Sequence, residues 1–239
     1  MTLLIEKKGK SELVNINEFQ DNIIKMLAHD LRSPISGMKF LAELIGRKDT
    51  ISEAKKHSVQ IVESYDDTLK LMDDLLSHIQ VDNQGLVLNR TNFIVENQIR
   101  TVFDLFADRI ELKELVIEAP SSKTYVFADQ LRFQQILTNL ISNAIKFNHK
   151  NGLVTVTVQQ DENQIIISVA DKGIGIPLDL QLEVFELFSS SGRAGTFGEK
   201  STGLGLSITK RLVALHKGVL SFTSEEGRGT TMKISLPKS

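Results

Sequence analysis

The sequence predicts an α-helical hairpin followed by an α+β two-layer sandwich. Three observations support this fold class: apolar residues between Ile16 and Ile79 recur with a heptad period, the period changes after Asp82, and the remainder mixes short β-rich runs with amphipathic segments. We therefore divide the chain into a connector (1–15), a helical domain (16–82) and an α+β domain (83–239).

The composition is that of an ordinary globular chain. A net charge of -2 over 239 residues predicts no polyanion partner such as nucleic acid. The absence of cysteine excludes disulfides and thiolate metal sites. No apolar run approaches the ~18 residues that span a bilayer, so we expect no membrane contact by this segment and a cytoplasmic location, although the parent protein can carry an anchor elsewhere.

The first predicted helix runs from about Ile16 to Ile45. If Ile24, Leu31, Met38 and Ile45 share one heptad position, His29 falls on the opposite, solvent-facing side. An acidic residue, Asp30, follows the histidine, and Pro34 can bend the helix. Packing alone explains such a histidine poorly, so we interpret it as a group presented to another molecule.

The second predicted helix begins at a capping box, Thr50 to Glu53, and continues to Ile79. Two long helices joined by a short turn leave one apolar face uncovered. Pairing with a second copy into a dimeric four-helix bundle would cover that face, so we expect a homodimer. The alternative is a monomeric bundle closed by the later domain.

The α+β domain is expected to contain three helices and seven strands. The helices are expected at 94–105, 131–147 and from about 202 to 216. The strands are expected at 86–88, 115–117, 125–127, 154–158, 165–169, 219–223 and 231–236, with a hairpin turn at Asp161 to Asn163.

The helix at 131–147 carries a polar stripe beside its apolar face. Asn139, Asn143 and Lys146 follow one another at spacings of four and three residues, which places them on one side. An amide oxygen is a suitable Mg²⁺ ligand and a lysine can meet phosphate charge. A solvated face with incidental asparagines is the equally weighted alternative for this helix taken alone.

Two glycine-rich stretches flank a polar segment. Asp171 to Pro177 places glycines at alternate positions after a carboxylate that can accept a hydrogen bond from an exocyclic amine. Taken alone, this stretch is better explained as a simple glycine turn. Thr202 to Ser207 opens a helix whose first amides can bind phosphate. The segment between them, Ser189 to Ser201, has the composition of a mobile lid.

Taken in order, these stretches resemble the two-component sensor histidine kinases, whose ATP-binding domain has the Bergerat-type fold of gyrase, Hsp90 and MutL. The resemblance covers nearly the whole chain from about residue 20. The matching boxes are His29 to Pro34 (phosphoacceptor), Asn139 to Ala144 (asparagine), Asp171 to Gly175 (first glycine), Phe185 to Phe188 (phenylalanine), Thr202 to Leu206 (second glycine) and Gly227 to Thr230 (last glycine).

The resemblance implies Mg²⁺ and ATP as cofactors. It implies that Asp171 binds adenine, that Asn143 holds Mg²⁺, and that Asn139 and Lys146 lie around the phosphates. The further residues that it implies in the nucleotide site are Gly173, Gly175, Lys200, Thr202, Gly203, Leu204, Gly205, Leu206 and Thr230.

The same resemblance implies the reaction and the partners. His29 would attack the γ-phosphorus with Asp30 as its base, and the phosphoryl group would pass to an aspartate in the receiver domain of a response regulator. Residues before Ile16 would receive the signal from an upstream sensor module. Ser33 stands where many relatives have threonine or asparagine, which puts phosphatase activity in doubt.

Two rival functions remain at this point. A pseudokinase would bind ATP without transfer, but every acceptor and ATP box is filled. A gyrase-type ATPase clamp would lack a heptad hairpin bearing a histidine. The other histidines, His57, His78, His149 and His216, have no clustered metal ligands beside them, so we interpret them as surface or structural residues.

Overall fold

The structure, a computed structural model, describes residues 31, 34–45, 51, 54–55, 57–62, 64–65, 68–69, 72, 87–186, 194–199 and 203–238. The chain divides into two compact units, Met1–Asp73 and Asp74–Ser239. Within the described residues, no helix combines the length and apolar content that crossing a bilayer requires.

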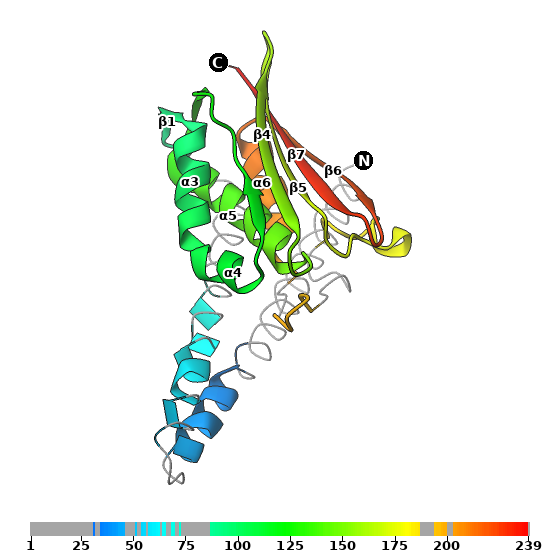
Figure 1. The fold of residues 1–239 in the computed structure, drawn as a ribbon. Coiled ribbons are helices and arrows are strands. Elements are labelled where there is room, and N and C mark those ends of the chain that lie inside the picture. The colour runs from blue at the N-terminus through cyan, green and yellow to red at the C-terminus, as the bar shows by residue number, and fades with distance from the viewer. Residues whose placement is uncertain are drawn as a thin grey trace, which may run out of the picture. The chain divides into compact units, whose positions relative to one another are not determined.

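The first unit is helical wherever it is described. Residues 34–45 and 57–62 are continuous helical stretches, and every other described residue between 31 and 72 is helical too, as the heptad pattern predicts (Figure 1). Several large apolar side chains on these helices are exposed in the single chain, among them Phe40 at 60% and Val62 at 58%. This unit therefore presents apolar surface that its own described residues do not cover.

The second unit is built on a five-stranded sheet with the order β2-β4-β5-β7-β6. Strand β2 is parallel to β4, and the other neighbours are antiparallel. The strands are β2 (Val116–Glu118), β4 (Leu153–Gln160), β5 (Gln164–Asp171), β6 (Val219–Glu225) and β7 (Gly229–Pro237). The predicted turn between β4 and β5 is confirmed, because Asp161 Oδ1 accepts from the amides of Asn163 (2.8 Å) and Gln164 (2.9 Å).

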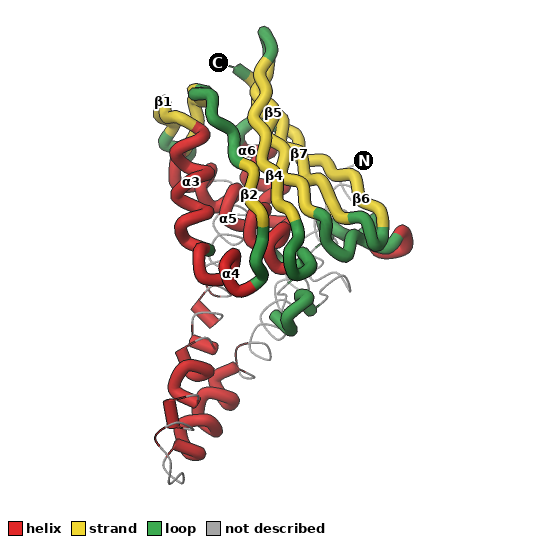
Figure 2. The backbone as a smooth tube through the Cα atoms, viewed as in Figure 1, coloured by secondary structure: helices red, strands yellow, loops and turns green. Residues whose placement is uncertain are grey.

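Helices form the second layer on one face of this sheet (Figures 1 and 2). They are α3 (Val95–Leu105), α5 (Gln130–Lys146) and α6 (Gly205–Leu215), with the short α4 (Ala107–Leu112) after α3. A 3-10 turn at Leu178–Leu180 follows β5 and lies apart from this layer, beside β6. A separate antiparallel pair, β1 (Arg90–Ile94) with β3 (Tyr125–Asp129), lies beside them. The α+β prediction is confirmed, with this second small sheet as an addition.

Helix α5 is the centre of the core. The helix contacts α6, α3 and β5. Its predicted apolar face is buried at Ile136, Leu137, Leu140, Ile141 and Ala144. Burial of one such Ile or Leu side chain contributes about 1.5 to 3 kcal/mol. The helix begins directly after β3, where the Asp129 side chain caps it by accepting from the amide of Arg132 at 3.1 Å.

One prediction about the elements was wrong, and two elements, β1 and α4, were not predicted. Residues 87–89 form no strand, and the strand begins instead at Arg90. Val87 is 89% exposed, so its short apolar run is not a buried strand. Strand β1 buries only Phe93 and therefore carries little hydrophobic signal. Helix α4 was also not expected, and it buries no residue at all.

Candidate functional site

The polar stripe of α5 divides into residues with different surroundings. Asn143 is half-buried and lines a cavity. Asn139 is turned toward α6, where its Nδ2 donates to Thr209 Oγ1 at 2.7 Å. The stem of Lys146 packs against Gly195, and its Nζ lies 5.2 Å from the ring centroid of Phe147. The stripe therefore combines one cavity residue with two residues that join α5 to neighbouring segments.

Asp171 ends β5 and also lines the cavity. Its Oδ1 accepts from the amides of Gly173 (2.9 Å) and Thr230 (3.2 Å), and no described residue hydrogen-bonds Oδ2. Burial raises the pKa of Asp171 to about 6, against the lowering effect of those two amides and of His149. One carboxylate oxygen is thus fixed by the backbone, and the other remains available to a ligand.

The glycines after Asp171 are required by close contacts between backbone segments. A Cβ on Gly173 would overlap the carbonyl of Phe147, and the next amide, Ile174, donates to that carbonyl at 3.0 Å. Gly175 has φ +63, and a Cβ there would overlap the carbonyl of Glu225. These glycines hold the loop against α5 and β6, which fixes the position of Asp171. Their contact with nucleotide stays a prediction.

The second glycine box leads into α6. Gly203 has the left-handed φ of +69, and Leu204 is buried. A Cβ on Gly205, the first residue of α6, would overlap the side-chain oxygen of Asn139, so a larger residue there would displace the Asn139 side chain. No described side chain caps the start of α6. The amides of its first turn, from Gly205 onward, lie at the positive end of the helix dipole, where an anion can bind.

One small cavity collects residues from several of these boxes. Its volume is about 70 Å³. Four predicted site residues line it: Asn143 from α5, Asp171 from β5, Leu206 from α6 and Thr230 from β7. They are brought together although they are spread over nearly ninety positions of the chain. Two hydrogen bonds fix the position of Thr230. Its amide donates to Asp171 Oδ1, and its hydroxyl lies 2.8 Å from the hydroxyl of Ser224.

The sequence reasoning missed the apolar walls of this cavity. Val169, Ile176 and Met232 line it together with Leu140, Ala144 and Phe147. Val169 and Met232 are buried neighbours on the paired strands β5 and β7. The inward alternation of β5 just before Asp171, and of β7 just after Thr230, was the signal that could have located Val169 and Met232.

Several predicted site residues lie outside the described residues. These are His29, Asp30, Lys200 and Thr202. Of the predicted lid, only residues 194–199 are described. The roles of these four residues stay predictions.

The oxygen atoms around the cavity fit a magnesium ion that binds together with a phosphate-bearing ligand. Within the described residues, no three His, Cys, Asp or Glu side chains gather into a metal site. No described residue hydrogen-bonds the side-chain amide of Asn143, which leaves its oxygen available in the cavity. Mg²⁺ commonly takes one or two protein oxygens and fills its shell with water and phosphate. Asn143 would hold the ion, whose charge would neutralise the triphosphate.

Two family models match this chain. The "His Kinase A (phospho-acceptor) domain" matches residues 19–82, which contain His29. The "Histidine kinase-, DNA gyrase B-, and HSP90-like ATPase" matches residues 128–239, which contain the cavity. The first match lies mainly in the first structural unit and the second lies in the second unit, and residues 1–18 and 83–127 lie outside both.

Curated relatives match the chain over almost its full length. The autoinducer 2 sensor kinase/phosphatase LuxQ of Vibrio parahaemolyticus is 30% identical over 99% of this chain and 29% of its own length. The sensor histidine kinase WalK of Bacillus subtilis is 31% identical over 95% of this chain and 38% of its own length. The chain thus spans less than half the length of these two relatives.

Solved structures agree with the sequence relatives. Histidine kinase AdeS of Acinetobacter baumannii has a TM-score of 0.69 at 25% identity, covering 88% of this chain and 98% of that one. Full-length ShkA in complex with AMPPNP has a TM-score of 0.64 at 27% identity, covering 89% and 45%. The catalytic domain of histidine kinase ThkA is 30% identical, with a TM-score of 0.55, over 63% and 97%. With both family models matched in order, the chain belongs to the two-component sensor histidine kinases.

Proposed function

We propose that this chain is the core of a sensor histidine kinase that transfers the γ-phosphoryl group of Mg-ATP to His29 and then to an aspartate of a response regulator. The observation that carries the proposal is the convergence of Asn143, Asp171, Leu206 and Thr230 on one cavity. Four sequence boxes with different chemistry supply these residues. A purely structural domain has no need to gather them.

The contacts of Asp171 support adenine as the group bound deepest. Its free Oδ2 can accept a hydrogen bond from the exocyclic amine of adenine, since Oδ1 already accepts two backbone amides. Val169, Ile176 and Met232 provide apolar surface for the flat ring. The relative ShkA, crystallised with the ATP analogue AMPPNP, supports the same ligand class.

The start of α6 and the end of α5 support binding of the triphosphate. The amides from Gly205 onward, which no described side chain caps, lie at the positive end of the helix dipole. Lys146 adds a positive charge near the end of α5, and Asn143 is the expected Mg²⁺ ligand. Catalysis of phosphoryl transfer depends mainly on such positioning and charge neutralisation.

The transfer step involves the imidazole of His29 as nucleophile. A bond forms between a ring nitrogen and the γ-phosphorus, the bond from that phosphorus to the β,γ-bridging oxygen breaks, and ADP leaves. Asp30 is the proposed base that accepts the imidazole proton. The aspartate of the receiver domain then takes the phosphoryl group from the phosphohistidine.

The proposal extends to assembly and location. The exposed apolar side chains on the described helices support a homodimer in which two hairpins form a four-helix bundle. The relatives are sensor proteins much longer than this chain, which supports a sensor module upstream. We place the kinase core in the cytoplasm, where ATP and the response regulator are found.

One labelling experiment tests the function. The chain is incubated with γ-labelled ATP and Mg²⁺, and the protein is assayed for acid-labile, alkali-stable label. We expect label in the wild type and in His57→Ala, and none in His29→Ala. His57 is the matched control because it lies in the same helical unit, where its ring contacts Gln60 at 3.2 Å.

A binding experiment separates the kinase from its rivals. Calorimetry should show that Asn143→Ala loses Mg-ATP binding, whereas Asn97→Ala, on the exposed face of α3, retains it. Label retained in His29→Ala, or nucleotide binding without any label in the wild type, would overturn the kinase assignment. The second result would favour a pseudokinase or an ATPase clamp.

A further inference from the structure

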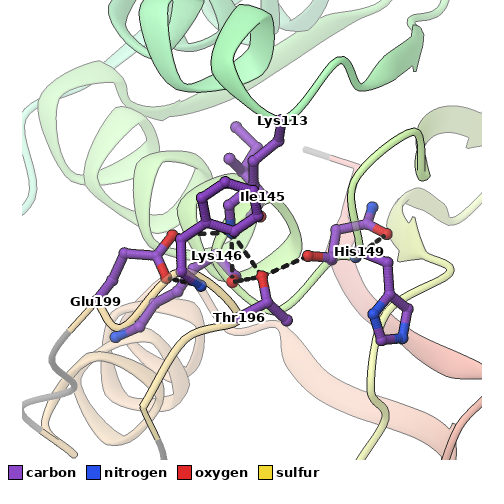
Figure 3. Close-up of polar contacts among 8 residues, drawn as sticks. Lys113, Ile145, Lys146, His149, Thr196 and Glu199 are labelled. Carbon is purple, nitrogen blue, oxygen red and sulfur yellow. Dashed lines mark hydrogen bonds and ion pairs between the residues drawn. The ribbon is translucent and has the colours of Figure 1, made fainter.

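Lys113, the residue that follows α4, is a buried charge outside the cavity. Its side chain is 2% exposed, although an ammonium loses a large hydration energy on burial. Buried lysines of this kind need hydrogen-bond acceptors for all their protons. Figure 3 shows the Lys113 side chain directed toward the end of α5, where it has several acceptors.

The first acceptors belong to the end of α5. The ammonium donates to the carbonyls of Ile145 (3.1 Å) and Lys146 (2.8 Å). Both carbonyls lie in the last turn of the helix, where the dipole favours a cation. Lys113 therefore stabilises the end of the helix that carries Asn143 and Lys146.

The remaining contacts belong to the segment Ala194–Glu199, which we call the anchored turn. Nζ of Lys113 donates to Thr196 Oγ1 (2.8 Å), pairs with Glu199 Oε1 (2.8 Å) and lies 4.8 Å from the ring centroid of Phe197. Partial burial acts to raise the pKa of Glu199, but hydrogen bonds from Lys113 and from backbone amides outweigh it and lower that pKa. The Glu199 carboxylate is thus ionised and paired at neutral pH.

The anchored turn also contacts Lys146. The amide of Thr196 donates to the carbonyl of Lys146 at 3.1 Å, and the Thr196 hydroxyl donates to the carbonyl of Asn148 at 2.6 Å (Figure 3). A Cβ added to Gly195 would lie 2.7 Å from Cγ of Lys146. The position of the turn therefore determines the space open to the Lys146 side chain.

We propose that Lys113 is a positioning residue for triphosphate binding, which acts by holding the anchored turn against the stem of Lys146. The inference rests on the proposed function, because Lys146 is the proposed phosphate contact. Lys113 does not line the cavity. Its effect reaches the triphosphate through Glu199, Thr196 and the Lys146 stem. It should leave the adenine end, at Asp171, unchanged.

A ligand comparison distinguishes positioning from a merely structural role. Dissociation constants for Mg-ATP and for adenosine are measured on the full chain for wild type, Lys113→Met and Glu199→Gln. We expect both variants to bind Mg-ATP about tenfold more weakly and adenosine as the wild type does, because only the triphosphate meets Lys146. Hydrogen exchange of peptides that contain residues 194–199 should accelerate in both variants.

The matched control is another lysine–glutamate ion pair with the same nitrogen–oxygen distance. Lys150 Nζ lies 2.8 Å from Glu114 Oε1, but both side chains are more than half exposed. We expect Lys150→Met to leave both dissociation constants unchanged. If Lys113→Met fails to fold, Glu199→Gln decides the question, since it leaves Lys113 its three uncharged acceptors.

The outcomes separate this inference from the proposed function. Wild-type Mg-ATP affinity in Glu199→Gln, together with faster exchange at 194–199, would overturn the positioning role alone. An equal loss of affinity for Mg-ATP and for adenosine would mean that Lys113 has only a structural role, and it would likewise overturn the positioning role. A wild-type chain that binds neither ligand would overturn the proposed function itself.

Discussion

The side-chain amide of Asn139 on α5 donates a 2.7 Å hydrogen bond to the hydroxyl of Thr209 on α6. That hydroxyl donates in turn to the carbonyl of Gly205 at 2.9 Å, and the oxygen of Asn139 packs directly against Gly205. The first asparagine of the asparagine box therefore fixes the first turn of α6. Because the proposed phosphate-binding amides belong to this turn, the two boxes depend on each other.

Thr209→Val should lower both stability and ATP affinity. Valine keeps the shape of threonine but leaves the Asn139 amide without its acceptor, which we expect to lower the free energy of unfolding by about 1 to 2 kcal/mol. Urea unfolding measures this loss, and calorimetry measures the affinity. In the double variant with Asn139→Ala the losses should not add, since both changes remove one interaction.

Thr101→Val is the control for that experiment. Thr101 lies on the exposed face of α3, and its hydroxyl also donates to the carbonyl four residues earlier, at 3.0 Å. It has no partner on another helix among the described residues. A loss of stability in Thr101→Val equal to that in Thr209→Val would contradict the role of the interhelical bond.

Gly175→Ala should destabilise the chain much more than Gly227→Ala. Both glycines have left-handed backbones, with φ of +63 and +76, so alanine meets a similar conformational cost of about 1 to 2 kcal/mol at either position. Only at Gly175 would the new Cβ also overlap a backbone carbonyl, that of Glu225, whereas Gly227 faces open space. Thermal unfolding of the two variants compares the costs, and equal melting temperatures would refute the contact argument.

The contribution of Asp171 to the free energy of unfolding should decrease as the pH rises from 3.8 to about 6. Its pKa is about 6 in the folded chain against 3.8 when unfolded, so between these values the unfolded state loses a proton that the folded state keeps. The stabilising contribution is present below pH 3.8 and is lost as pH rises through about 6, a change on the order of 3 kcal/mol. The difference in unfolding free energy between wild type and Asp171→Asn, measured against pH, should show this decline. A flat difference would contradict the raised pKa.

Periodic features of the chain could be predicted, and contacts between distant segments could not. The core face of α5 was correctly predicted because Ile136, Leu137, Leu140 and Ile141 repeat at helical spacing. The partners of Gly173 and Gly175 are carbonyls of remote residues, which leave no local pattern. Nothing in the sequence around Lys113 marks it as buried, since its acceptors lie 32 to 86 positions further along the chain.

His216 should make stability fall as pH drops below neutrality. The ring is buried, its Nδ1 lies 2.8 Å from the carbonyl of Leu212, and its Nε2 accepts from the amide of Asp129 at 3.1 Å, which requires the neutral form. Burial lowers the pKa of His216 below its usual value of 6.5. As the pH falls through 6.5, the unfolded chain therefore binds a proton on this histidine while the folded chain does not. His216→Gln removes the titration, and its unfolding free energy should decline less than that of the wild type between pH 7 and 5. Identical slopes would exclude this contribution.

Leu69→Glu should convert the proposed dimer into monomers. Leu69 lies on the predicted apolar seam and is 41% exposed in the single chain, although a leucine gains stability only when covered. A glutamate there would bring two like charges into a bundle interface, at a cost that exceeds what one apolar contact contributes. Sedimentation at micromolar concentration should show a dimer for the wild type and a monomer for the variant. Ser58→Glu, at an exposed position of the same helical unit, should remain dimeric, because among the described residues the Ser58 hydroxyl hydrogen-bonds only the carbonyl of Lys55. A monomeric wild type would mean that the apolar seam is covered within one chain, as in the monomeric bundle that the sequence left open.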